Sequence, residues 1–173
     1  MAAITEKMQD ALNGQITAEM YSTNLYLAMA AYFESLDLAG FAHWMRVQAK
    51  EEDFHVHKLF DYITERGGRV VIGAVEAPPV EWASPLEAFE STYEHEQEVS
   101  AMVSKLVEVA QAENDRATES YLRWFVDEQV EEEASVDRVV KMLRLGDGQP
   151  VAMLMLDREM SARPEPTPPT PAE

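Results

Sequence analysis

Glu51-Glu52-Asp53-Phe54-His55 is the stretch that decides the fold of this 173-residue chain. It places a carboxylate and an imidazole three residues apart, so Glu52 and His55 share one face of a helix. That face belongs to a largely apolar stripe with alternating steps of three and four residues. The stripe comprises Phe41, Met45, Gln48, Glu52, His55, Leu59 and Tyr62. An ionisable pair therefore lies on a surface that we expect to be buried.

Three further stretches of the chain repeat this pattern. The 7 glycines and 9 prolines are segregated, which leaves four long segments almost free of helix breakers. We expect helices at about 5–34, 38–66, 85–112 and 117–145. The first helix has the stripe Leu12, Ile16, Glu19, Thr23, Tyr26, Ala30 and Phe33, the third has Leu86, Phe89, Tyr93, Glu96, Ser100, Val103 and Val107, and the fourth has Leu122, Phe125, Gln129, Glu132, Val136, Val139 and Leu143. Each of these stripes is also interrupted near its middle, and the interrupting residues are Glu19, Glu96, Gln129 and Glu132.

The connections between these helices predict the topology. The first and second helices, and the third and fourth, are joined by a few residues each, which indicates two antiparallel hairpins. About 17 residues, 67–83, join the second helix to the third; at ~3.3 Å per residue they can span the ~42 Å length of a helix. We therefore predict an all-α, up-down-down-up four-helix bundle with one long crossover.

Local signals mark the helix ends and the C-terminal segment. Asp37 is expected to cap the second helix, and Ser84-Pro85-Leu86-Glu87 reads as a capping box with proline at the first helical position. Gly67 and Gly146 suit left-handed helix ends. Pro150 begins a short apolar fifth helix, and five prolines in 163–173 predict a disordered tail. We therefore expect one domain over 1–162, followed by this tail.

The negative charge of the expected buried carboxylates requires a compensating positive charge. Burying one ionised carboxylate costs several kcal/mol, and the stripes contain no Lys or Arg to offset four of them. Two divalent cations would balance the four negative charges. Ligation dominated by carboxylates with one imidazole favours iron or manganese over structural zinc. The stripes therefore predict a dimetal site inside the bundle.

Composition excludes several other functions. Asp and Glu number 32 against 14 Lys and Arg, a net charge of −18. This balance argues against nucleic acid or an anionic membrane as a partner. The absence of cysteine excludes disulfides, thiolate metal sites and rubredoxin-type iron. Because no signal peptide or long apolar run is visible, we expect a cytoplasmic protein.

Four motifs together make the sequence resemble the bacterial and archaeal non-haem ferritins over about residues 4–160. They are Gly14-Gln15-Ile16-Thr17-Ala18-Glu19-Met20-Tyr21-Ser22, Glu51-Glu52-Asp53-Phe54-His55, Thr92-Tyr93-Glu94-His95-Glu96-Gln97 and Trp124-Phe125-Val126-Asp127-Glu128-Gln129-Val130-Glu131-Glu132-Glu133. Bacterioferritins differ because they carry a haem-ligating methionine at the position of Asp53. The resemblance therefore implies iron as the metal, without haem.

The resemblance also implies the roles of individual residues. Glu19, Glu52 and His55 would bind a first iron. Glu52 would bridge to a second iron held by Glu96 and Glu132. Further members of the implied site are Gln129 near the second iron, Tyr26 near both metals, and a third iron position at Glu51, Glu128 and Glu131.

The implied activity is that of a ferroxidase that stores iron. Fe(II) would be oxidised by O₂ or peroxide and kept as a ferric mineral inside a hollow homo-oligomer of 24 subunits. The short fifth helix favours this interpretation, because its apolar side chains need a burial partner. The alternative is a non-storage di-iron or di-manganese oxidoreductase of the same superfamily.

Overall fold

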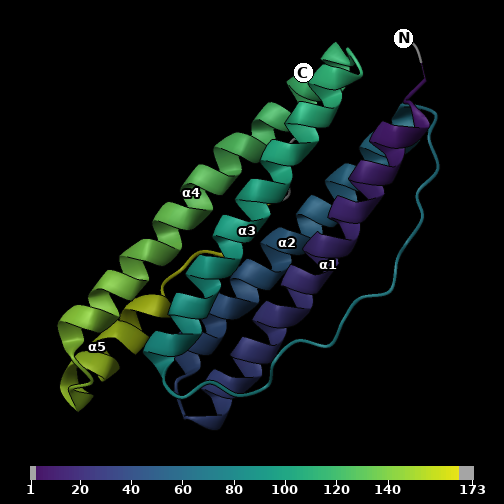
Figure 1. Ribbon diagram of the computed structural model, residues 1–173. Coiled ribbons are helices and arrows are strands. Elements are labelled where there is room, and N and C mark those ends of the chain that lie inside the picture. Colours follow the sequence, from purple (N-terminus) through teal and green to yellow (C-terminus); the bar gives the residue numbers. More distant parts are fainter. Residues whose placement is uncertain (1–2, 168–173) are drawn as a thin grey trace.

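The computed structural model describes residues 3–167, and these residues form five helices and no strands. The helices are α1 (Glu6–Ser35), α2 (Ala39–Glu65), α3 (Pro85–Ala112), α4 (Arg116–Gly146) and α5 (Pro150–Met160). The first four lie side by side in a bundle, with α1 next to α2 and α3 next to α4 (Figure 1). The predicted all-α four-helix bundle with a short fifth helix is confirmed.

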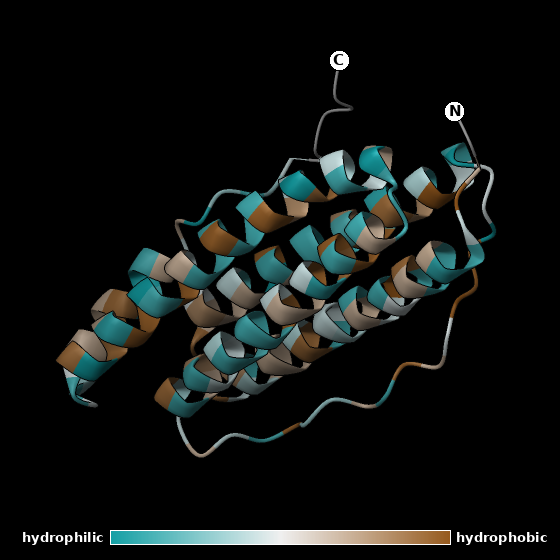
Figure 2. Cartoon of the chain, turned by 45° about the horizontal axis from the view of Figure 1, so that its top comes forward, coloured by the Kyte–Doolittle hydropathy of each residue, from teal (hydrophilic) through white to brown (hydrophobic). Residues whose placement is uncertain are grey.

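The segment between α2 and α3 runs along the outside of the bundle from one end to the other (Figures 1 and 2). It is tied to α1 by hydrogen bonds. The amide of Asn13 donates to the carbonyl of Arg69 at 3.1 Å, and its oxygen accepts from the backbone N–H of Val71 at 3.0 Å. The long crossover predicted from loop length is therefore present, and it makes α2 and α3 run in the same direction.

The predicted N-cap of α3 is confirmed, whereas the predicted N-cap of α2 is wrong. The Ser84 hydroxyl accepts from the N–H of Glu87 at 3.1 Å, as predicted, whereas the Glu87 carboxylate accepts from the N–H of Ala83. Asp37 does not cap α2, because it adopts a left-handed conformation with φ 57°. Instead Asp157 of α5 accepts from the first amides of α2, those of Gly40 at 2.8 Å and Phe41 at 3.0 Å.

The helix ends also differ in one place from the sequence expectation. Gly67 has φ 71°, as predicted for a left-handed residue after α2. Gly146 is the last residue of α4, and the left-handed turn falls on Asp147 and Gly148 instead. Within residues 3–167, no helix is both long and apolar enough to cross a membrane.

The apolar interior consists of two clusters, one towards each end of the bundle. One is built from 25–33, 38–49, 88–89, 136–143 and two residues of α5, and the other from 8–16, 59–63, 99–110 and 122–125. On every bundle helix the stripe residues that interrupt the apolar pattern fall between these two clusters. The core therefore encloses a polar layer at mid-bundle.

Helix α5 packs across one end of the bundle against α2 and α4. Leu156 and Met160 are buried there, but Val151, Leu154 and Met155 are about two-thirds exposed or more. The apolar surface predicted for this helix is thus only partly covered within one chain.

The docking of α5 depends on a glycine. A Cβ at Gly40 would lie 1.7 Å from the carbonyl oxygen of Asp157, so alanine cannot fit unless α5 moves. We predict that Gly40→Ala lowers the free energy of unfolding by about 1–3 kcal/mol, as overpacking does. Thermal or denaturant unfolding measures this.

Gly14→Ala is the matched control. Gly14 also lies within a helix, but nothing comes within 4 Å of a Cβ built there. This substitution should stabilise the protein by about 0.5–1 kcal/mol because helical alanine loses less entropy on folding. Equal stability of Gly40→Ala and Gly14→Ala would contradict the close packing of α5 on α2.

Candidate metal centre

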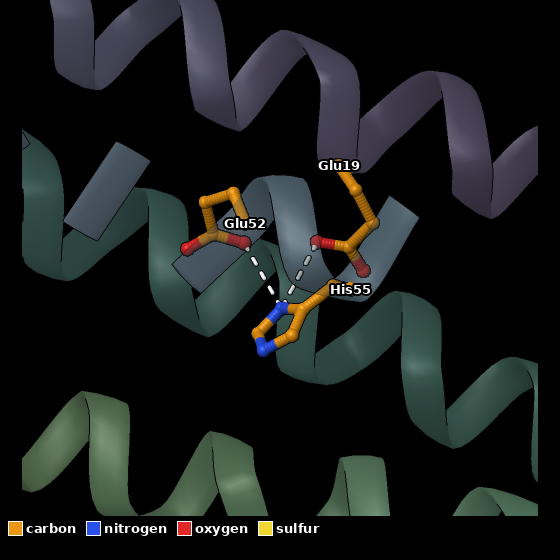
Figure 3. A group of neighbouring side chains, drawn as sticks. All are labelled: Glu19, Glu52 and His55. Atoms are coloured by element: carbon orange, nitrogen blue, oxygen red, sulfur yellow. Dashed lines mark hydrogen bonds and ion pairs between the residues drawn. The ribbon is translucent and has the colours of Figure 1, made fainter. Parts of the chain in front are cut away.

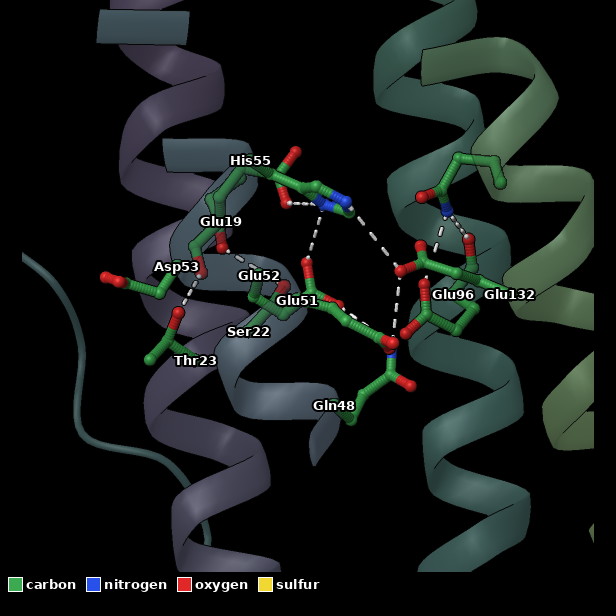
Figure 4. Close-up of polar contacts among 12 residues, drawn as sticks. Glu19, Ser22, Thr23, Gln48, Glu51, Glu52, Asp53, His55, Glu96 and Glu132 are labelled. Atoms are coloured by element: carbon green, nitrogen blue, oxygen red, sulfur yellow. Dashed lines mark hydrogen bonds and ion pairs between the residues drawn. The ribbon is translucent and has the colours of Figure 1, made fainter. Parts of the chain in front are cut away.

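The polar layer gathers ionisable side chains from all four bundle helices. Glu19 comes from α1, Glu52 and His55 from α2, Glu96 from α3 and Glu132 from α4. Each is at most 5 % exposed, as is Gln129 beside Glu132. The expected convergence at one level of the bundle is therefore present (Figure 4).

His55 joins three of the four carboxylates. Its Nδ1 lies 3.1 Å from Glu52 Oε2 and 3.6 Å from Glu19 Oε2 (Figure 3), and its Nε2 lies 3.9 Å from Glu132 Oε1. The ring is held edge-on against Trp124, with the ring centroids 5.4 Å apart. An aromatic wall and two carboxylates thus fix the orientation of the imidazole.

The α3–α4 side of the layer is organised by hydrogen bonds to Glu96. The hydroxyl of Tyr26 donates to Glu96 Oε1, and the amide of Gln129 donates to Glu96 Oε2 at 3.2 Å. The Glu96 carboxylate is therefore aimed into the bundle from two sides. Tyr26, on α1, is completely buried.

Two buried groups have ligand atoms close enough together to hold a metal ion. Glu19, Glu52 and His55 form one, and Glu52, Glu96 and Glu132 form the other, with ligand atoms within 4.8 Å of one another in each. Glu52 belongs to both groups. It is therefore placed to bridge two cations.

Two buried oxygens show that the carboxylates are not satisfied by the protein alone. Glu19 Oε2 and Glu132 Oε2 have no hydrogen-bond partner among the described residues. Leaving a buried charged oxygen without a partner is costly. A cation between the helices would satisfy both, so the residues present fit a metal pair.

The pKa values in the layer report crowding of negative charge. Burial, together with Glu96 and Glu19, raises the pKa of Glu52 to about 8. Burial also raises the pKa of Glu96 to about 7 and raises that of Glu132. Although burial opposes its ionisation, the pKa of Glu19 is lowered by His55, and the carboxylates in turn raise the pKa of His55. In the absence of a cation, bound protons thus neutralise part of the negative charge of the buried carboxylates.

The three residues expected at a third iron position are not equally close to the pair. Glu128 is half-buried and forms a third metal-capable group with His55 and Glu132. Glu51 is directed to an arginine, Arg163, 2.5 Å away. Glu131 is exposed and belongs to no such group within residues 3–167.

Three polar partners of the layer were not among the predicted site residues. Gln15 donates to Glu19 Oε1 at 2.7 Å. Gln48 donates to Glu52 Oε1 at 3.1 Å and to Glu132 Oε1 at 3.2 Å. Both glutamines lie four residues before a site carboxylate, a spacing that could have revealed them. No comparable signal marked Arg163, which was expected to begin a solvated tail but is largely buried.

Comparisons with known proteins agree on one family. The family model of the ferritin-like domain matches residues 9–145. The bacterial non-heme ferritin of Bacteroides fragilis is 46% identical over 161 residues, which cover 92% of this chain and 99% of that protein. Its Staphylococcus aureus counterpart is 39% identical, covering 92% and 96%. The open-pore ferritin of Archaeoglobus fulgidus has a TM-score of 0.93 at 55% identity, covering 94% of this chain and 100% of that one.

We predict that the metal-free protein loses stability as the pH rises through about 7 to 8. The pKa values of Glu52 and Glu96 are higher in the fold than in the unfolded chain, so their protonated forms favour folding at low pH. The raised pKa of His55 acts in the same direction. Thermal unfolding of metal-free protein between pH 6 and 9 measures this slope.

Asp53→Asn serves as the control, because Asp53 is an exposed carboxylate next to Glu52. It should leave the slope unchanged, whereas Glu52→Gln should flatten it. Stability that rises over this range would show that the buried carboxylates ionise without penalty.

Proposed function

Because the chain belongs to the ferritin family and is an iron-storage protein with ferroxidase activity, we propose that it oxidises Fe(II) at the polar layer. Glu19, Glu52 and His55 hold the first iron. Glu96 and Glu132 hold the second, with Gln129 beside it, and Glu52 bridges the two. One observation carries this assignment: the two buried metal-capable groups share Glu52.

Charge and proton balance support the assignment. Two Fe(II) ions supply the positive charge that four buried carboxylates lack. Binding at neutral pH displaces protons from Glu52 and Glu96, whose pKa values are about 8 and 7. Two Fe(II) ions would then give two electrons to O₂, which takes up two protons to form hydrogen peroxide, or to hydrogen peroxide, which takes up two protons to form two waters. Holding both ions side by side lets one oxidant collect both electrons.

Tyr26 and the outer carboxylates have supporting roles in this proposal. Tyr26 donates a hydrogen bond to Glu96 and so positions a ligand of the second iron. Glu51, Glu128 and Glu131 form a third iron position that tunes turnover. Iron is the metal in every position, and no haem is bound, since Asp53 offers no ligand of the kind that bacterioferritins use.

The mineral is stored inside a hollow shell of 24 subunits in the cytoplasm. Support comes from α5, whose exposed Val151, Leu154 and Met155 need a partner surface. Residues 1–162 form the di-iron domain of each subunit, and 163–173 form a C-terminal extension. The end of this extension lies outside the described residues.

Glu52→Gln tests the dimetal assignment. We predict that rapid Fe(II) oxidation falls by at least about tenfold, because a bridging ligand loses its charge while its shape is kept. Metal-free Glu52→Gln should be no less stable than the wild type, since glutamine is neutral at every pH whereas Glu52, with a pKa of about 8, must bind a proton to avoid a buried charge. Stopped-flow oxidation and thermal unfolding measure the two effects.

The neighbouring exposed substitution Asp53→Asn is the control and should oxidise iron at the wild-type rate. His55→Ala should weaken mainly the first site, because His55 belongs to the group with Glu19. Wild-type oxidation by Glu52→Gln would mean that the metal pair lies elsewhere.

Storage predicts a large particle that fills with iron. After aerobic Fe(II) loading, native mass measurement should find an assembly on the order of several hundred kDa that contains many irons per subunit. The non-storage oxidoreductase predicts a small oligomer with two metals per subunit. A stable monomer or dimer that retains only two irons would exclude storage.

A further inference from the structure

The described residues that follow α5 stay against the bundle. Residues 163–167, here called the strap, turn back along α2 towards the polar layer. The Arg163 side chain is only 16 % exposed. Its Nη2 lies 2.5 Å from Glu51 Oε2 and 2.9 Å from Gln48 Oε1, and its Nη1 donates to the carbonyl of Trp44 at 3.3 Å.

Several further contacts hold the strap in place. The guanidinium carbon of Arg163 lies 4.1 Å from the centroid of the Trp44 ring, a cation–π contact. His43 Nε2 donates to the carbonyl of Arg163 at 2.8 Å, and Lys50 pairs with Glu165 at 2.5 Å. The strap therefore follows α2 for about two turns from residue 43 to residue 51.

The strap forms one wall of a pocket that reaches the metal centre. This pocket of 470 Å³ is lined by Glu51, His55 and Glu128 on the bundle side and by residues 163–167 on the other. Glu128 and His55 already belong to a metal-capable group with Glu132. The positive charge of Arg163 thus lies next to the position proposed for the third iron.

Arg163 and a third iron compete for the same carboxylate. The guanidinium carries a permanent positive charge and occupies Glu51 Oε2. A divalent cation bound to Glu51 and Glu128 would be repelled by that charge. We propose that Arg163 is a tethered cation that competes with Fe(II) for Glu51, so the strap sets the affinity of the third iron position.

This inference rests on the proposed function, because it assumes iron at Glu51 and Glu128. When the third position is empty, Arg163 neutralises Glu51 and closes the pocket wall. When Fe(II) arrives, the ion replaces the guanidinium and the strap is released. Because the strap stays attached to α5, it remains at high effective concentration and returns when the ion moves on. Competition of this kind keeps the third ion exchangeable.

Gln48 connects this competition to the metal pair. Its oxygen accepts from Arg163, while its amide donates to Glu52 and Glu132. Arg163 thereby positions a residue that touches both metal-capable groups of the pair. Release of the guanidinium removes that restraint on Gln48. Arg163 is a positioning residue, since it bonds to Gln48 and Glu51, which are not proposed ligands of the metal pair.

Anaerobic titration with Zn(II), which has no redox chemistry, tests the competition. Calorimetry on the assembled wild type, Arg163→Gln and Glu51→Gln identifies the third step as the one that Glu51→Gln removes. We expect Arg163→Gln to tighten this step roughly tenfold, as removal of a competing charge-assisted hydrogen bond should. Arg163→Lys keeps the charge but loses the forked geometry, so its Zn(II) affinity at this step should lie between those of the wild type and Arg163→Gln.

Arg46→Gln is the matched control. Arg46 is an exposed arginine on α2, the helix that carries Glu51, and it pairs with Glu34. This substitution should leave every Zn(II) step unchanged. In the Glu51→Gln background, Arg163→Gln should have no further effect on Zn(II) binding. Unchanged or weaker binding in Arg163→Gln overturns the proposal, as does an equal effect with and without Glu51.

The two proposals fail separately. Rapid oxidation of the first two irons by the wild type tests the metal pair and does not depend on the strap. If that phase is absent, the proposed dimetal assignment fails. If it is present and the Zn(II) step that Glu51→Gln removes does not respond to Arg163, only the inference about the strap fails.

Discussion

The structure depends on one electrostatic constraint: four carboxylates and one imidazole are buried in the middle of an apolar bundle. Burial and mutual repulsion of the ionised carboxylates cost free energy that a domain stable by only about 5–15 kcal/mol cannot absorb without compensation. The two apolar clusters stand on either side of this layer and hold the four helices in fixed register. The bundle therefore keeps together groups that would otherwise separate. Protons or cations must occupy the layer, and the raised pKa values of Glu52 and Glu96 record this need.

The sequence predicted which polar side chains are buried where apolar spacing determined the inner face of a helix. All seven predicted stripe residues of α2 are buried, and so are those of α4. The stripe of α3 was less accurate, because Thr92, Val99 and Leu106 are buried while Tyr93 and Val107 are only partly so. Helix α3 carries alanine, serine and threonine close to its stripe, so apolar spacing alone does not define its inner face. Convergence of the polar residues followed from helix length and register, which local patterns do encode.

The errors share a different cause, which is contact between segments far apart in the sequence. Asp37 had the right side chain to cap α2, but Asp157 of α5 caps it instead. Asp157 lies 117 residues further along the chain than Gly40, from whose N–H it accepts a hydrogen bond. Arg163 stands in a proline-rich segment whose composition favours a solvated tail. Its position is decided instead by Glu51, Gln48 and the Trp44 ring. The positive charge that pairs with Glu51 thus comes from outside the bundle, where no periodicity could indicate it.

Helix α5 and the strap are both held against α2, although their sequences suggest a helix followed by a separate tail. One face of α5 leaves Leu154 and Met155 exposed, while Asp157 fixes the helix to the start of α2. From there only a few residues separate α5 from Arg163. Because both ends of this segment are bound to α2, a shift of α5 along the bundle would also move the guanidinium relative to Glu51. The contact that seats α5 on the bundle therefore also sets where the tethered charge meets the metal centre.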